Sequence, residues 1–289
     1  MGQAYAVTAL DGVAFGMLLF VVAAGLTLIF GVMQVFNLAH GTLYLAGAYL
    51  AWMFGAGLPG LAATVALALL VGAGVGALLS LVLPHQARDA HSSHALITLG
   101  IAFLTADAFT TVFGPEPRSV TAPAPLDGSV QLFGHGYPSY RLVFIAVAAL
   151  IAAALYWSIR RSTAGLLLRA AVTDPAMAAA TGIPTAAVRT TALAVGGSLA
   201  VTGGALGAPL LGPAPGVDTT VLTLSLIVVV LGGAGSIPAT LAAALLVGQI
   251  QTVGVIATPT LAPFALFAAL LLALVVRGRH AALTVGRPA

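Results

Sequence analysis

The stretch that decides the fold runs from Gly25 to Trp52 and reads GLTLIFGVMQVFNLAHGTLYLAGAYLAW. It is hydrophobic enough to cross a bilayer, but polar and small residues from Asn37 to Gly41 interrupt it. An unpaired backbone amide or carbonyl in hydrocarbon is costly, so irregular backbone is tolerated there only where protein buries it or a watery cavity adjoins it. Transport proteins build substrate paths from helices broken in this way. The stretch therefore predicts a polytopic membrane protein that moves a solute.

The overall composition agrees with a membrane protein. Of the 289 residues, 60% are hydrophobic and 6% are charged, and the mean hydropathy is +1.11. A soluble domain with these values would expose large apolar patches, so we predict an all-α, polytopic integral membrane protein. The first dozen residues contain no basic segment, and the hydrophobic run after them is too long for a signal peptide. We expect the first helix to remain in the mature chain.

Two residue types are missing, and each absence excludes a class of function. Without cysteine the chain has no disulfides and no thiolate metal sites. Without lysine it cannot form the phosphate-binding loop of an ATPase, which needs a lysine on the nucleotide phosphates. The ten basic residues are all arginines and are spread thinly along the chain. They fit membrane orientation signals better than a nucleic-acid-binding face.

Hydrophobic stretches alternate with polar or Gly/Pro-rich connections along the chain. A crossing needs about 20 apolar residues, and we expect hydrophobic segments at 12–36, 41–57, 58–83, 95–113, 142–159, 190–211, 219–256 and 260–276. The segment at 41–57 is short. The segment at 219–256 is too long for one crossing and is broken by Gly232, Gly233, Gly235 and Pro238. The sequence therefore predicts about eight transmembrane segments, two of them broken, in a single domain spanning residues 1–289.

The positions of the arginines give an orientation. Eight of the ten lie in three segments, the loop at 84–94, the loop at 160–189 and the C-terminal tail. The positive-inside rule places these segments in the cytoplasm. The connection at 114–140 is rich in Pro and Gly, so we expect a turn-rich loop on the outside. The N-terminus has no basic residue, and we place it outside as well.

The cytoplasmic loop at 160–189 contains a short helix with recognisable ends. Thr173 or Asp174, followed by Pro175, is an N-cap and first-turn signal. Gly182 stands where a residue just past a helix end belongs. The helix between them has roughly two turns and is too short to be stable alone in water. Because its surface is small, smooth and nearly uncharged, we predict that it docks a cytoplasmic partner; the alternative is that it rests on its own bundle.

The first break carries two strongly polar side chains, Asn37 and His40. In one interpretation they line a translocation pathway together with Gly41 and Thr42, with the glycine allowing close approach of the backbone. In the other, Asn37 caps the following helix and His40 satisfies a neighbouring carbonyl.

The second break repeats this arrangement in the other half of the chain. Its candidate pathway residues are Gly232, Gly233, Gly235 and Ser236. A glycine turn needed only for packing is the alternative. Paired interrupted segments at corresponding positions favour a transport pathway, and they also suggest an internal structural repeat.

Other polar residues have competing interpretations. Asp107 is an acid within a hydrophobic segment, as in a proton-coupled carrier, or it faces water near the outer end. Asp218 is expected to be a helix N-cap. We predict no metal site, because carboxylates and cysteines are missing at ligand spacing around His85, His91 and His94.

Three motifs of the chain resemble the permease subunits of high-affinity, Liv-type branched-chain amino acid ABC importers. They are GLTLIFGVMQVFNLAHGTLYLAGAYLA from Gly25, GLLLRAAVTDPAMAAATGIPTAAVR from Gly165 and VVVLGGAGSIPATLAAALLVG from Val228. Their order and separations match, and the resemblance covers roughly Gly25 to Leu274. It implies a permease that is not an enzyme and holds no cofactor, with ATP used by partner subunits.

The same resemblance implies a set of partners and a location. The permease would lie in the bacterial inner membrane with a cytoplasmic C-terminus, among membrane lipids. It would pair with a second homologous permease subunit, sit on two cytoplasmic ATP-binding subunits and receive a small-molecule substrate from a periplasmic binding protein, with no nucleic acid involved. Contact with the ATPase would involve Arg169, Ala170, Asp174, Pro175, Ala178 and Gly182. Thr42 departs from the more polar residue frequent at this position, so urea or short amides remain alternative substrates, and an ion-coupled secondary transporter remains an alternative class.

Overall fold

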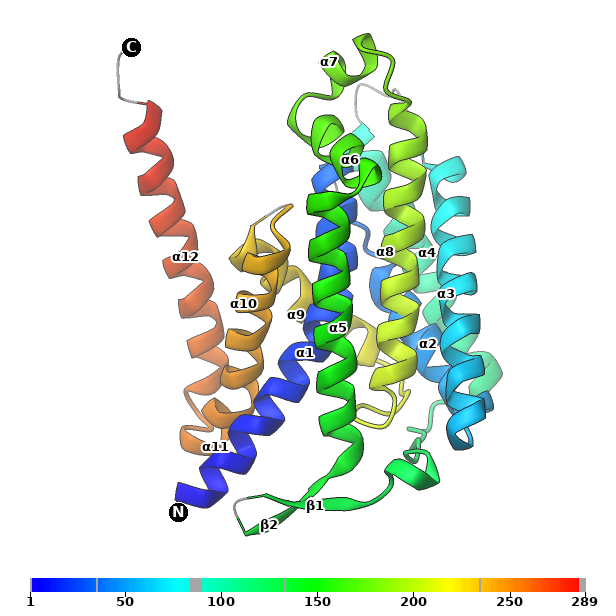
Figure 1. Ribbon diagram of the computed structural model, residues 1–289, viewed down its shortest axis with the longest axis vertical. Helices are drawn as coiled ribbons and strands as arrows, with labels where there is room; N and C mark the ends of the chain where they lie inside the picture. Colours follow the sequence, from blue (N-terminus) through cyan, green and yellow to red (C-terminus); the bar gives the residue numbers. More distant parts are fainter. Residues whose placement is uncertain (1, 35, 84–89, 133, 234, 286–289) are drawn as a thin grey trace.

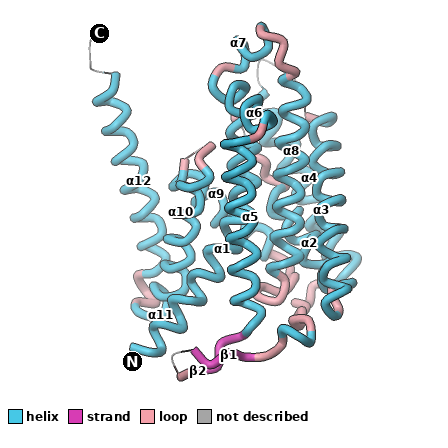
Figure 2. Tube along the Cα trace, in the orientation of Figure 1, coloured by secondary structure: helices cyan, strands magenta, loops and turns pink. Residues whose placement is uncertain are grey.

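The chain folds into a bundle of helices with a short strand pair at one end (Figures 1 and 2). The computed structural model describes residues 2–34, 36–83, 90–132, 134–233 and 235–285. Three residues that entered the predictions lie outside the described part: His85 of the metal-site prediction, and Arg88 and Arg287, two of the eight arginines used for the orientation. Within the described part, six apolar helices are long enough to cross a membrane, and shorter apolar helices accompany them. The predicted all-α, polytopic membrane fold is therefore confirmed.

Each predicted hydrophobic segment contains a helix. The helices are α1 (Gly2–Met33), α2 (His40–Phe54), α3 (Gly57–Val82), α4 (Ala90–Phe113), α5 (Ser139–Arg161), α6 (Thr163–Thr173), α7 (Pro175–Ala180), α8 (Thr185–Gly207), α9 (Val217–Gly232), α10 (Ile237–Gln249), α11 (Val255–Ala257) and α12 (Ala262–Val285). A π-helical turn, Ile250–Gly254, joins α10 to α11. The sequence did not predict α6, and α1 begins ten residues before the predicted hydrophobic segment at 12–36.

The first helix, α1, forms the centre of the bundle. Of its membrane-spanning part, 83% is buried inside the bundle. It packs against α5, α8, α9 and α10. Small residues bring the backbones together, since a Cβ on Gly16 would lie only 2.8 Å from the carbonyl oxygen of Ala244 in α10. Such contacts between small residues drive helix association in lipid, where apolar side chains gain little by leaving the solvent.

The first break separates two helices and does not divide one. The Tyr5–Met33 part of α1 is by itself a full span of 29 residues. His40, the first residue of α2, has its Nε2 3.0 Å from the carbonyl oxygen of Val22. Val22 lies eleven residues before the end of α1, about 16 Å at 1.5 Å per residue. The chain therefore re-enters the bundle after Met33, and α2 begins at mid-depth.

The second break lies between α9 and α10, as the glycines predicted. Gly233 and Gly235 have φ angles of +84° and +82°, a left-handed backbone that other residues rarely adopt. Gly232 has a different function, because a Cβ there would lie 2.7 Å from the Cα of Thr240. The glycines thus permit both the reversal of the chain and the close packing of α9 on α10.

The connections gather by type at the two ends of the bundle (Figure 1). The helices of the arginine-rich loop, α6 and α7, lie at the same end as the C-terminal end of α12. The N-terminus lies at the opposite end, near an antiparallel hairpin of β1 (Ser129–Leu132) and β2 (His135–Pro138). This hairpin belongs to the predicted turn-rich connection, but its strands were not predicted. The arginine-rich loop at 160–189 and the C-terminal end of α12 therefore lie at one end of the bundle, and the hairpin lies at the other.

Candidate translocation and coupling sites

Hydrogen bonds satisfy the polar backbone around the first break. The Oδ1 of Asn37 accepts a hydrogen bond from the amide of Ala39 at 3.1 Å. The amide of His40 donates a hydrogen bond to the carbonyl of Asn37 at 3.2 Å. The amide of Leu38 donates to the hydroxyl of Thr98 in α4 at 3.2 Å. Because every one of these groups is paired, the break is stable at membrane depth.

Asn37 and His40 are both buried, with exposed fractions of 3% and 0%. The Nε2 of His40 meets the carbonyl of Val22, and the Asn37 side chain holds the entry to α2. These contacts support the second interpretation above, in which both residues organise the backbone. The Nδ2 of Asn37 and the Nδ1 of His40 have no hydrogen-bond partner among the described residues.

Gly41 and Thr42 lie beside a pocket of about 270 Å³ between α2, α4 and α9. Gly41 contacts the backbone of Asp218 so closely that a Cβ would overlap its carbonyl oxygen. The pocket is mainly apolar, and its lining includes Leu38, Leu99, Ala102, Phe103, Ala106, Asp218, Thr219 and Leu222. Of the first-break residues predicted for a pathway, Gly41 and Thr42 are the two that adjoin this space.

Asp218 does not have the predicted N-cap position. The N-cap of α9 is Gly216, which has a φ of +88°, and Asp218 lies within the first helical turn. A carboxylate there still complements the positive end of the helix dipole. Asp218 is 5% exposed and also lies beside the pocket described above.

The two breaks share α1 as a neighbour. The first break meets α1 at Val22, and the second meets it through a buried hydroxyl pair, Thr27 to Thr240, at 3.2 Å. A Cβ on Gly31 would be 3.7 Å from Gly235, so the glycine turn also adjoins α1. Gly232 is buried, whereas Gly235 and Ser236 are exposed at the turn. The structure therefore brings one residue of each predicted pathway set, His40 and Gly235, next to the same central helix.

The short helix α7 has the predicted ends. Asp174 is its N-cap, and the carboxylate accepts the amide of Met177 at 2.9 Å. Gly182 has a φ of +84°. Its amide donates a hydrogen bond to the carbonyl of Ala179, and the amide of Ile183 donates one to the carbonyl of Ala178, both at 3.0 Å. This pair of bonds is a Schellman motif, which satisfies the last carbonyls of a helix.

Most of α7 is exposed, but one predicted coupling residue is not. Pro175, Ala179 and Gly182 are exposed, and Met177 is 61% exposed. Ala178 is only 4% exposed because it faces the bundle. Ala178 is therefore a packing residue, which corrects its predicted place on the docking surface; α7 contacts its own chain through α6 and α8.

The preceding helix, α6, connects α7 to the bundle. Ser162 caps it by accepting the amide of Gly165 at 3.0 Å. The Arg169 guanidinium donates to the carbonyl of Ile159 near the end of α5, and Ala170 is half-buried. A capping serine before an amphipathic run was the signal that could have revealed this helix.

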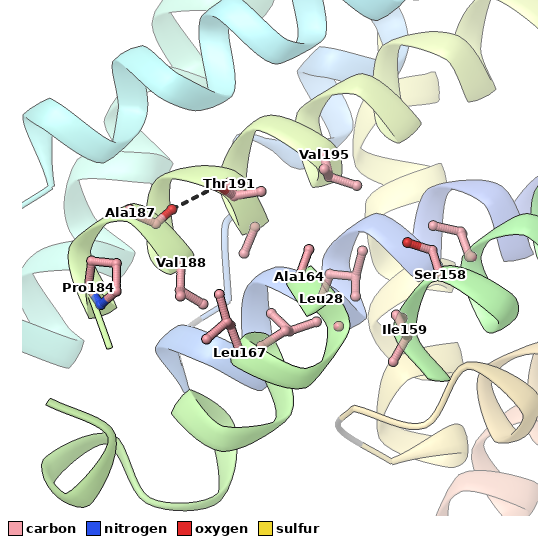
Figure 3. A pocket seen from close by; sticks show the side chains of 14 residues that line it. Leu28, Ser158, Ile159, Ala164, Leu167, Pro184, Ala187, Val188, Thr191 and Val195 are labelled. Carbon is pink, nitrogen blue, oxygen red and sulfur yellow. Dashed lines mark hydrogen bonds between the residues drawn. The ribbon is translucent and has the colours of Figure 1, made fainter. Parts of the chain in front are cut away.

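A pocket of about 210 Å³ separates part of α6 from the bundle (Figure 3). Figure 3 shows Leu167 of α6 near Val188 of α8, and Ala164 of α6 beside Leu28 of α1. The lining is almost entirely apolar. The base of α6 is therefore not fully packed against the core.

The structure contains an ion pair that the sequence did not predict. Asp11 in α1 and Arg141 in α5 form an ion pair between their side chains. They are 130 positions apart, so no local spacing connects them. In the described part of the chain, no group of three or more His, Cys, Asp or Glu residues could hold a metal ion.

Comparison with known proteins identifies the family. Residues 8–276 match the family described as branched-chain amino acid transport system / permease component, a broad family that covers several ABC permeases. None of the curated proteins matches the chain. Among solved structures, the chain is similar to "PsaBC from Streptococcus pneumoniae in complex with Fab", with a TM-score of 0.47, 11% identity and coverage of 92% of this chain and 89% of that one. Since the family match spans nearly the whole chain, this protein belongs to the branched-chain amino acid transport permease family.

Proposed function

We propose that the chain is the membrane-spanning permease subunit of an ATP-driven ABC importer and that it translocates branched-chain amino acids. The observation that carries this proposal is α7, a six-residue helix capped at both ends and exposed at the end of the bundle. A helix of this length has no stability of its own in water. Its caps and its single buried residue, Ala178, are consistent with a rigid projection that fits a partner's groove.

The partner must supply the energy, because the chain lacks the lysine of a nucleotide-binding loop. Two cytoplasmic ATP-binding subunits in contact with α7 meet this requirement. Arg169, Ala170, Asp174, Pro175 and Gly182 would then belong to the coupling element, directly on α7 or through α6. This element would lie in the cytoplasm of a bacterial cell, with the C-terminal end of α12 on the same side.

Contacts within the chain provide a route from α7 to the breaks. The helix α7 contacts α6, and α6 contacts α1, α5 and α8. The bond from Arg169 to the carbonyl of Ile159 joins α6 to α5. Because both breaks contact α1, a displacement of α6 would reach them through this central helix. The partly unfilled space beneath α6 gives that displacement room.

The apolar pocket beside Gly41 and Thr42 supports a hydrophobic substrate. Its volume, about 270 Å³, is just below the roughly 300–1,000 Å³ range of small-molecule sites. Leu99, Phe103 and Leu222 provide an apolar lining. An aliphatic side chain would gain from burial there, whereas urea or a short amide has little apolar surface to bury. The substrate would arrive from a periplasmic binding protein, and a second, homologous permease would complete the membrane part.

The test is uptake by the reconstituted complex. Proteoliposomes containing this permease, its second permease and both ATP-binding subunits are supplied with binding protein and radiolabelled leucine, isoleucine or valine. We expect uptake that requires ATP, persists when ionophores remove ion gradients, and is not competed by urea or acetamide. Uptake that ignores ATP and collapses with the gradient would contradict the proposal and favour an ion-coupled carrier, for which the exposed Asp107 of α4 is the candidate carboxylate.

A further inference from the structure

A third cavity lies around the ion pair of Asp11 and Arg141. It has a volume of about 410 Å³ and lies between α1, α5, α9 and the π-helical turn. This volume is within the usual range of small-molecule sites, roughly 300–1,000 Å³. Its lining includes the early residues of α1 and α5, whose first turns lie in the half of the bundle that carries the N-terminus and the hairpin (Figure 1).

The ion pair is accessible from the cavity. The side chains of Arg141 and Asp11 are 35% and 33% exposed, and both residues line the cavity. The pairing joins the Nη1 of Arg141 to the Oδ1 of Asp11, and the phenol of Tyr137 lies near both charges. Ionisable residues within membrane helices are costly, and they commonly mark substrate pathways.

The π-helical turn supplies a second feature of a binding site. It places Gln251 and Thr252 in the cavity wall. The amide side chain of Gln249 donates to the carbonyl of Ala9 at 2.9 Å and holds the turn against α1. Single π-helical turns within α-helices often occur at functional sites, because the extra residue redirects side chains. Across the cavity, Thr220 of α9 contributes another hydroxyl.

We propose that this cavity binds the charged end of an amino acid during its entry into the permease. The α-carboxylate would bind the guanidinium of Arg141, whose planar N–H groups match carboxylate geometry. The α-ammonium would bind the carboxylate of Asp11. The aliphatic side chain would lie against Ala14, Phe15 and Leu224. A zwitterion carries one charge of each sign, as the ion pair does. When it binds, Asp11 and Arg141 exchange each other for the ammonium and the carboxylate of the ligand, and no net charge is left buried.

The competing explanation is a structural one, in which the ion pair only joins α1 to α5. Partly exposed ion pairs contribute little to stability, about 0–1 kcal/mol, whereas the helices already share an apolar interface. A purely structural pair also does not account for the cavity beside it. The inference rests on the proposed function, because a permease for a substrate without these charges would have no use for them.

The experiment measures leucine uptake by the reconstituted complex with substitutions at both charges. Asp11→Asn and Arg141→Gln each remove one contact to the zwitterion, and Glu116→Gln, an exposed acid of the outer connection, is the matched control. We expect the KM for leucine to rise about tenfold or more in both variants, as for the loss of a hydrogen bond to a charged group. The control keeps the KM of the unmodified complex.

A charge exchange separates recognition from structure. Combining Asp11→Arg with Arg141→Asp restores an ion pair but reverses its direction relative to the apolar wall. Uptake that stays impaired in this double variant supports the proposal, and full recovery overturns it. If the single variants fail to assemble, Arg141→Lys is the deciding variant, because lysine keeps the positive charge but lacks the planar guanidinium. A raised KM for leucine supports binding of the substrate carboxylate by Arg141, and an unchanged KM overturns it.

Failure of the inference and failure of the proposed function give different results. If the unmodified complex takes up leucine with ATP and the variants keep its KM, the binding site is disproved and the importer function stands. If the unmodified complex takes up no branched-chain amino acid, the proposed substrate fails, and the inference fails with it. Competition by 3-methylbutylamine and 4-methylpentanoate, each carrying one charge of leucine, checks the assignment. We expect the carboxylate to lose its inhibition in Arg141→Gln and the amine to lose its inhibition in Asp11→Asn.

Discussion

Replacing Gly182 with alanine tests the coupling function of α7 with little other disturbance. Gly182 has a φ of +84°, and a Cβ added there would meet no atom within 4 Å. The substitution Gly182→Ala therefore introduces no clash. Its cost comes from holding an L-residue in the left-handed region, about 1–2 kcal/mol.

This cost is large for so short a helix. Because α7 has six residues and no stability of its own, a loss of about 1–2 kcal/mol reduces the population of the capped conformation by up to about 5–30-fold. The apparent affinity for a partner falls by the same factor, since only the competent conformation binds. We expect a corresponding rise in the apparent Kd between membrane vesicles containing the permease and the purified ATP-binding subunit.

Gly182→Asn is the matched control, because asparagine tolerates the left-handed conformation better than alanine does. We expect asparagine to restore most of the affinity that alanine loses. Equal affinities for glycine, alanine and asparagine would refute the docking function of α7. An equal loss in both variants would show that the partner reads the glycine surface and not the helix cap.

Three further predictions concern packing, motion and pH. Gly47→Ala should lower the thermal midpoint of the purified permease by several degrees, because a Cβ there overlaps the carbonyl of Val201, whereas Gly74→Ala, with nothing within 4 Å, should leave it unchanged; equal midpoints would contradict the packing of α2 on α8. Ala164→Leu should fill the pocket under α6 (Figure 3) and slow uptake without weakening ATPase binding, and normal uptake would show that α6 does not need this space. Burial, and then the nearby Asp11 carboxylate, raise the pKa of Tyr137 in the hairpin to about 12. Because the folded state prefers the neutral phenol, the free energy of unfolding of the permease should fall as pH rises from about 10 to about 12. The Tyr137→Phe variant should lack this pH-dependent loss of stability in alkaline denaturation.

The features that the sequence predicted well depend on neighbouring residues. The caps of α7 follow from Asp174, Pro175 and Gly182, which act within one or two turns of the helix. The glycines of the second break likewise set their own backbone, so the separation of α9 from α10 was visible in the chain. Local chemistry of this kind can be inferred before the fold is known.

The features that the sequence could not predict depend on packing between distant segments. The depth of His40 is set by its contact with Val22 in α1, and a hydrophobicity pattern does not give that depth. The inward direction of Ala178 was hidden because two turns of alanine and methionine have no polar face to set the periodicity. Asp11 and Arg141 each fell one residue before a predicted hydrophobic segment, 12–36 and 142–159. Neither position indicated an ion pair.

The central position of α1 has a consequence for biosynthesis. This helix is synthesised before the other described helices, and two of its main partners, α8 and α10, begin only at Thr185 and Ile237. Until they are made, the glycine-lined faces of α1 that pack on α8 and α10 lack these partners, and Asp11 lacks Arg141 until α5 is made. Biogenesis of this permease must therefore hold α1 in the bilayer until α8 and α10 are inserted, because the bundle cannot close around α1 before then.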